Sequence, residues 1–157
     1  MTTTASYRHE LESHVALRDG SVAHIRPIRA EDEPHLLALL RGLSDGDRRF
    51  RFFSLGNDLS RTAHDEADVD NVHSLGLLAS VGSPERIVGH ALYAPAGDGR
   101  AEVAFAITAE YQGRGLATIL LGQLADAAAA AAKLIDGHRS IVVAPGGEGL
   151  RPRPLRS

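Results

Sequence analysis

Residues 112–117 read Gln-Gly-Arg-Gly-Leu-Ala and separate a short alternating apolar stretch from a long helical one. Glycine lets a chain turn sharply and bring its N–H groups close to a ligand. The first turn of a helix has backbone N–H groups without partners, and it carries the positive end of the helix dipole. A strand, a glycine turn and a helix in this order therefore predict a site that binds a pyrophosphate through the backbone alone.

Other motifs that handle phosphates or acyl groups are absent from the sequence. No Gly-Lys-Ser/Thr follows a glycine loop, and no glycine completes Gly-x-Gly-x-x-Gly after Gly115. No serine stands in a nucleophile elbow with a matching order of histidine and aspartate. These absences argue against a Walker A site, a dinucleotide fold and a serine hydrolase.

The strand predicted just before the glycine turn carries a single carboxylate. Alternation sorts its side chains into two faces, which are Ala101, Val103, Phe105 and Ile107 on one side and Glu102, Ala104 and Ala106 on the other. We interpret the first face as core and the second as nearly bare, with room for a ligand chain. Glu102 at the edge of such a cleft could act as a general base, because partial burial raises a carboxyl pKa. The alternative is a solvated glutamate on an exposed sheet face.

The composition bounds the class of protein that can position these residues. The chain has 157 residues, which suffices for one domain with a real core. Its net charge of −3 gives no electrostatic reason to expect nucleic acid or an anionic membrane as a partner. The absence of cysteine excludes disulfides, thiolate catalysis and cysteine-based zinc sites. Since residues 1–10 lack a secretory pattern and no apolar run approaches ~20 residues, we expect a cytoplasmic protein.

Hydrophobic periodicity predicts an α+β fold. The expected strands are 22–28, 75–81, 86–94, 101–107 and 140–144. The expected helices are 31–43, 48–53 and 113–135. Residues 56–70 are interpreted as loop with at most a helical turn. The passage from strand 101–107 through the long helix to strand 140–144 implies a parallel pair with a right-handed crossover.

Eight histidines are scattered along the chain. His64, Asp65, Glu66, Asp68, Asp70 and His73 could suggest a metal, but no histidine pair has the i, i+4 spacing of a helical zinc motif. We therefore predict no metal site. Arg48, Arg49 and Arg51 could contact a phosphate, although a solvated helix face is the alternative.

In this setting the chain resembles the GCN5-related N-acetyltransferase (GNAT) superfamily. Its signature for the acetyl-CoA pyrophosphate loop is Gln/Arg-x-x-Gly-x-Gly/Ala, which Gln112 to Ala117 satisfies. The segments around 18–32, 43–53 and 69–81 are similar to the protein-lysine acetyltransferase (Pat-like) branch. The resemblance covers residues 17–144, with residues 1–16 expected to be a loose lead-in.

The resemblance implies a three-layer α/β fold with a mixed, mostly antiparallel sheet flanked by helices. It implies acetyl-CoA as co-substrate, no metal, and a primary amine such as a protein lysine as acceptor. Glu102 would take the proton from that amine, and a backbone N–H near Ile107 would stabilise the oxyanion. The implied cofactor-binding residues are Phe105, Ala106, Ile107, Gln112, Gly113, Arg114, Gly115, Leu116, Ala117 and Thr118.

The chain departs from the family after Ala144. The family fold continues there with a helix and a pair of strands, which often supply a tyrosine, whereas no tyrosine follows Tyr111 here. We expect a member shortened at its C-terminus, with residues 145–157 as a disordered tail and strand 140–144 as an exposed edge that favours a homodimer. The alternatives are a non-catalytic acetyl-CoA-binding module, an inactive fragment, or a regulatory domain on an acyl-CoA-synthetase-like partner.

Overall fold

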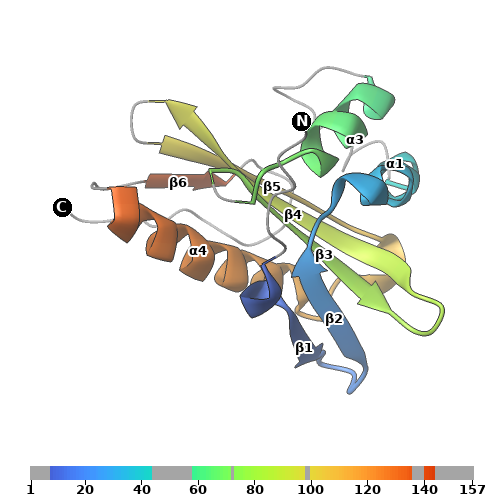
Figure 1. Cartoon of the computed structure of the whole chain (residues 1–157). Helices are drawn as coiled ribbons and strands as arrows, with labels where there is room; N and C mark the ends of the chain where they lie inside the picture. The colour runs from blue at the N-terminus through green and yellow to red at the C-terminus, as the bar shows by residue number, and fades with distance from the viewer. Residues whose placement is uncertain (1–7, 44–57, 72, 98–99, 136–139, 144–157) are drawn as a thin grey trace.

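The fold is built on one mixed sheet. The computed structural model describes residues 8–43, 58–71, 73–97, 100–135 and 140–143. Six strands follow one another across the sheet in chain order (Figure 1), and they are β1 (Ser13–Ala16), β2 (Val22–Pro27), β3 (Leu75–Val81), β4 (Arg86–Gly97), β5 (Arg100–Ile107) and β6 (Ser140–Val143). Neighbouring strands are antiparallel from β1 to β5, and β6 runs parallel to β5. The predicted mixed, mostly antiparallel sheet is confirmed.

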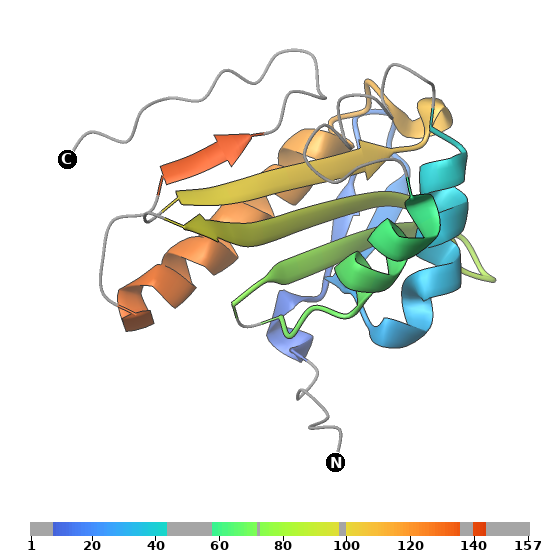
Figure 2. The ribbon, with the colours of Figure 1, turned by 90° about the horizontal axis from the view of Figure 1, so that it is seen from above.

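Helices cover both faces of this sheet. The long helix α4 (Leu116–Ile135) lies across one face, while α1 (Glu33–Arg41) and α3 (Leu59–Ala67) lie on the other, as Figures 1 and 2 show. Short 3₁₀ turns occupy His9–Leu11, Ala30–Asp32 and Ala109–Tyr111. The predicted three-layer arrangement is therefore confirmed. None of the described helices is long and apolar enough to cross a membrane.

The face under α4 contains the larger hydrophobic cluster. Leu116, Leu120 and Leu124 recur at i, i+4 spacing, and each is at most 1% exposed. They pack with inward-facing residues of the strands, among them Tyr93 and Ile25. Burial of one leucine side chain contributes about 2 kcal/mol. These leucines therefore fix α4 on the sheet and place its N-terminus at the end of β5.

The opposite face contains a second cluster. Leu36 and Leu40 of α1 pack with Ala63 of α3 and with Leu78 and Ala106 of the sheet. Because Ala106 is 3% exposed and lies in this cluster, the β5 face that carries Glu102 is not bare at its Ala106 end. The predicted open face was wrong there, because α1 and α3 cover it.

Two local predictions need correction. Residues 13–16 do not form part of a loose lead-in, because β1 pairs with β2 over its whole length, from Ser13 opposite Ile25 to Ala16 opposite Val22. Residues 59–67 form the helix α3, and Asp58 caps it by accepting a hydrogen bond from the Arg61 N–H. The predicted helix 48–53 and the predicted tail 145–157 lie outside the described residues.

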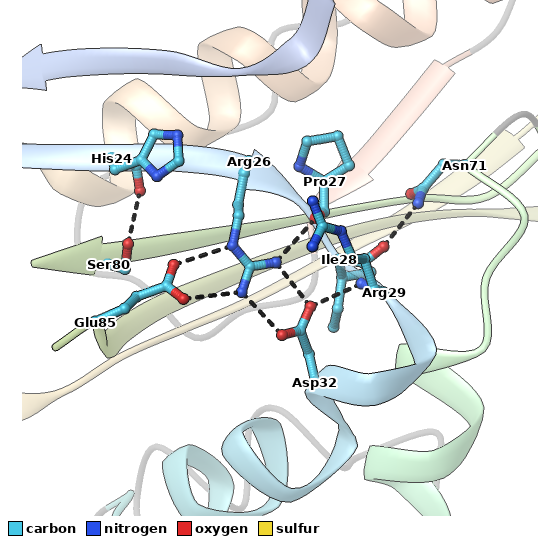
Figure 3. A network of polar contacts seen from close by, with 9 residues as sticks. All are labelled: His24, Arg26, Pro27, Ile28, Arg29, Asp32, Asn71, Ser80 and Glu85. Atoms are coloured by element: carbon cyan, nitrogen blue, oxygen red, sulfur yellow. Dashed lines mark hydrogen bonds and ion pairs between the residues drawn. The ribbon is translucent and has the colours of Figure 1, made fainter. Parts of the chain in front are cut away.

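A buried charge network joins α1 to the sheet (Figure 3). Arg26 of β2 donates from its two terminal nitrogens to both oxygens of Asp32, at 2.7 and 2.8 Å, and its Nε donates to Glu85 at 3.0 Å. Asp32 also accepts the Arg29 backbone N–H at 2.8 Å. Arg26 and Asp32 are 7% and 6% exposed, so water contributes little to their stabilisation. The paired charges therefore hold the start of α1 against the strand that precedes it.

This network makes the free energy of unfolding depend on Asp32. Burial raises the pKa of the Asp32 carboxyl. The hydrogen bonds from Arg26 and the Arg29 N–H lower this pKa by more than burial raises it, so the net pKa lies below the ordinary 3.8. At pH 7 we expect Asp32→Asn to lower the free energy of unfolding by about 3 kcal/mol, because Arg26 stays buried without its bidentate partner. The difference in the free energy of unfolding between Asp32→Asn and wild type has its full size above the ordinary carboxyl pKa. It shrinks as the pH falls through the lower pKa that Asp32 has in the folded protein.

Denaturant unfolding at several pH values measures this effect. The matched control is Asp65→Asn, since Asp65 is exposed and lies 3.9 Å from its partner Arg61, so its loss costs about 0.5 kcal/mol or less. Equal destabilisation by the two variants, or a difference that persists unchanged in acid, would contradict the assignment.

Candidate functional site

The glycine turn predicted from the sequence adopts the backbone conformation that glycine favours. Gly113 and Gly115 have φ angles of +76° and +88°, in the left-handed region. A Cβ on Gly113 would meet no atom within 4 Å, whereas a Cβ on Gly115 would lie 3.4 Å from the Arg18 side chain. At position 113 the positive φ angle, rather than a lack of room for a side chain, therefore requires glycine. At position 115 the φ angle is also positive, and the Arg18 side chain lies against the glycine.

The turn leads into the N-terminus of α4, where no side chain from the described part of the chain caps the backbone. The Ile119 N–H donates to the Gly115 carbonyl at 3.1 Å, which is the first backbone bond of the helix. The N–H groups of Leu116, Ala117 and Thr118 precede that bond and have no helical partner. The Arg114 carbonyl, one turn before Thr118, accepts instead from the Arg18 N–H at 3.2 Å. The positive end of a helix of 20 residues is thus available to an anion.

The β1–β2 connection supports the turn from the side. Besides the backbone bond from Arg18, the Asp19 carboxylate accepts a hydrogen bond from the Arg114 guanidinium. The Ser21 hydroxyl and N–H lower the pKa of Asp19 most, with a smaller contribution from Arg114. The guanidinium of Arg114 also lies 4.6 Å from the centre of the Tyr111 ring, a cation–π distance. The Arg114 side chain is therefore committed to Asp19 and Tyr111.

The last part of β5 presents a backbone edge beside this turn. β6 pairs with β5 only from Arg100 to Val103, and no other described strand follows that edge to Ile107. The Thr108 N–H donates to Val88 on β4 at 3.0 Å, so strand alternation turns the Ile107 amide the other way. There the Ile107 carbonyl accepts from Gln112 Nε2 at 3.1 Å. Gln112 thus ties the signature turn to the open edge.

The predicted site residues fall into groups with different roles. The backbones of Gly113 to Thr118 form the helix entrance, and those of Phe105 and Ile107 lie along the open edge. Ala106 is buried under α1, and its backbone faces its β4 partner His90, so it is poorly placed to touch a ligand. Glu102 lies in the paired part of β5, between Ala94 of β4 and Val142 of β6.

The residues that support the turn were not among the predicted site residues. Arg18 and Asp19 entered the sequence analysis only through the similarity of segment 18–32 to the Pat-like branch. Tyr111 packs against the larger hydrophobic cluster and also lies against Arg114. The one sequence signal for Arg18 and Asp19 was the Asp-Gly turn, which does not reveal what lies beside it.

The sequence analysis predicted that the acidic and histidine residues of α3 and the segment after it do not form a metal site. His64 contacts Glu33 of α1 at 3.1 Å, and His73 contacts Asp70 at 2.8 Å. Glu33 raises the pKa of His64, chiefly through their hydrogen bond. In the described part of the chain, no three side chains of the ligating types gather closely enough to hold a metal ion.

With this geometry established, comparison with known proteins identifies the family. Residues 40–142 match the model of the acetyltransferase (GNAT) family. The chain belongs to the GNAT family. The match includes β3, β4, β5, the glycine turn, α4 and most of β6. The GNAT resemblance predicted from Gln112 to Ala117 is confirmed.

Individual relatives refine the placement within the GNAT family. The crystal structure of the GNAT domain of S. lividans PAT superposes with a TM-score of 0.71 at 31% identity, covering 80% of this chain and 76% of that one. This similarity supports the predicted Pat-like branch. A ribosomal-protein-alanine N-acetyltransferase from Brucella melitensis shares the fold, with a TM-score of 0.51, 16% identity, and coverage of 77% and 78%.

A curated relative is longer than the part that aligns. An acetyltransferase from Pseudomonas aeruginosa is 34% identical over 124 residues, which are 76% of this chain and 65% of that protein. This GNAT chain therefore spans about two thirds of the relative's length.

The positive φ angles give a stability prediction for the turn. We expect Gly113→Ala and Gly115→Ala each to lower the free energy of unfolding by about 1 kcal/mol, because an L side chain is strained in the left-handed region. Gly115→Val should cost more than Gly113→Val, since its methyl groups meet Arg18.

Chemical denaturation measures these differences, and the matched control is Gly122→Ala in the middle of α4. Gly122 has no positive φ and no neighbour near an added Cβ, so alanine there should stabilise the protein by about 0.5–1 kcal/mol. A stabilising effect of alanine at 113 or 115 would contradict the strained turn.

Proposed function

We propose that this GNAT domain transfers the acetyl group of acetyl-CoA to a primary amine, with a protein lysine as the acceptor. The observation that carries the proposal is the uncapped N-terminus of α4 beside the open edge of β5, joined by the bond from Gln112 to the Ile107 carbonyl. The N-terminus of α4 suits a diphosphate, and the open edge of β5 suits a chain that contains amide groups. Family membership and the acetyltransferase named above support the same reaction.

The residues present fit acetyl-CoA in two ways. The N–H groups from Gly113 to Thr118 would bind its diphosphate, because they have no helical partners and lie at the positive helix end. The amides of Phe105 and Ile107, on the edge beyond the β6 pairing, would pair with its pantetheine arm. Acetyl-CoA supplies an acetyl thioester, an activated acyl group.

The acceptor needs a base, because a lysine amine has a pKa of about 10.4 and is protonated at neutral pH. We propose Glu102 for this role, either directly or through a water molecule. The resemblance to the family carries this assignment, and the structure adds that Glu102 lies on the strand whose later residues form the open edge. A backbone N–H of that edge near Ile107, one that the pantetheine arm leaves free, would stabilise the negative charge that develops on the acetyl oxygen.

Two further parts of the proposal follow from the reaction and the topology. Because acetyl-CoA is a cytoplasmic co-substrate, we place the reaction in the cytoplasm. β6 is an outer strand of the described sheet, and pairing of two β6 edges remains our proposal for a homodimer.

A second candidate function is a non-catalytic acetyl-CoA-binding module. The observation that favours it is that the helix N-terminus and the open β5 edge account for acetyl-CoA binding through the backbone, without any side chain acting as a base. Acetyl-CoA binding without acetyl transfer to any of a broad panel of amines would select this candidate over the enzyme.

The decisive variant for catalysis is Glu102→Gln. It removes the base while keeping the size of the side chain, so we expect turnover to fall at least 100-fold with the Kd for acetyl-CoA unchanged. A thiol-release assay and calorimetry give the two readouts. The matched control is Glu31→Gln, since Glu31 is exposed beside α1 and should leave both values unchanged. Equal turnover in Glu102→Gln and wild type would remove Glu102 from the mechanism.

A further inference from the structure

Three arginines from different parts of the chain lie near the glycine turn, and two of them are committed to protein partners. Arg114 bonds Asp19 and stacks on Tyr111. Arg86, from the start of β4, bonds Glu110 at 2.7 Å and lies 5.7 Å from the centre of the same tyrosine ring. Each of these two guanidiniums therefore already has a carboxylate partner within the protein.

Arg18 differs from both. Its side chain is exposed and lies over Gly115, with Nε 3.4 Å and Cγ 3.7 Å from the position of a Cβ on that glycine. Within the described ranges, no carboxylate pairs with the Arg18 guanidinium. Its own neighbour Asp19 is engaged by Ser21 and Arg114.

The backbone fixes Arg18 in this position. Its N–H donates to the Arg114 carbonyl at 3.2 Å, so the residue is attached to the turn itself. Two further bonds close the β1–β2 connection, from the Leu17 N–H to the Ser21 carbonyl at 2.8 Å and from the Gly20 N–H to the Leu17 carbonyl at 3.0 Å. The guanidinium therefore starts from a rigid hairpin end rather than from a loose segment.

This placement is electrostatically unfavourable without an anion. The N-terminus of a helix is its positive end and disfavours a nearby cation. Arg18 nevertheless lies beside the entrance of α4, against Gly115. A bound phosphate reverses this balance, because its charge attracts the guanidinium and the helix end together. Arginine also offers paired N–H donors that match phosphate oxygens.

We propose that Arg18 is a direct ligand of the diphosphate of coenzyme A, and that Arg114 of the signature instead braces the turn through Asp19 and Tyr111. This inference rests on the proposed function. It assigns one phosphate-binding side chain to the β1–β2 connection, outside the segment that the family model matches. It also changes the prediction for Arg114 from a cofactor-binding side chain to a supporting one.

Calorimetric titration of the full chain tests the proposal. We expect Arg18→Ala to weaken binding of coenzyme A about tenfold or more, as for loss of a charge-assisted hydrogen bond, and Arg18→Lys to recover part of the loss. The same loss is expected with dephospho-coenzyme A, which keeps the diphosphate. Pantetheine, which lacks phosphate, should bind both proteins equally. The matched control is Arg61→Ala, because Arg61 is 82% exposed on α3.

Thermal unfolding without ligand separates a binding role from a structural one. Without ligand, Arg18→Ala should melt no lower than wild type, because it removes a cation from the positive helix end. It should gain less stability than wild type on addition of coenzyme A. A loss that disappears with dephospho-coenzyme A would assign Arg18 to the 3′-phosphate and overturn the proposal. The proposal would also be overturned if wild type binds coenzyme A and the Arg18→Ala and Arg61→Ala variants bind it with equal affinity. Absence of coenzyme A binding by folded wild type would instead refute the proposed function.

Discussion

The arrangement of the site depends on two glycines that hold the backbone in the left-handed region before α4. This conformation reverses the chain between the end of β5 and the start of the helix, so the helix begins with three N–H groups that no described residue caps. A side chain at either position would strain the turn. The proposed phosphate site therefore needs no dedicated cation from the turn itself, and the role of the rest of the molecule is to hold the turn and the helix in place.

Three sets of contacts provide that support. The leucines of α4 fix the axis of the helix on the sheet, and burial drives their packing. The Gln112 bond to Ile107 sets the distance between the turn and the strand edge. The β1–β2 connection, through Arg18 and Asp19, holds the turn from the N-terminal side. On the far face, Arg26 and Asp32 hold the start of α1, which packs over Ala106.

Among the described residues, the open edge begins where the pairing of β6 ends. The four residues of β6 pair with β5 as far as Val103, while the next residues of β5 keep their β4 partners. Backbone amides at Phe105 and Ile107 thus face away from β4 with no described strand beside them. This division within a single strand, one part paired on both sides and one part open on one side, gives Glu102 and the amides their separate proposed roles.

The sequence by itself determined the elements with strong local signals. The alternation of residues 75–81 and 101–107, the i, i+4 leucines of α4 and the glycines of the turn each follow from period and backbone preference. They led to the GNAT fold and to the proposed phosphate-binding turn. Only the tertiary structure decided that residues 13–16 pair with β2 and that Asp19 engages Arg114. It also decided that α1 covers Ala106 and that Arg18 lies over Gly115. These are contacts between distant segments, which depend on how the layers pack and leave no periodic pattern in the local sequence.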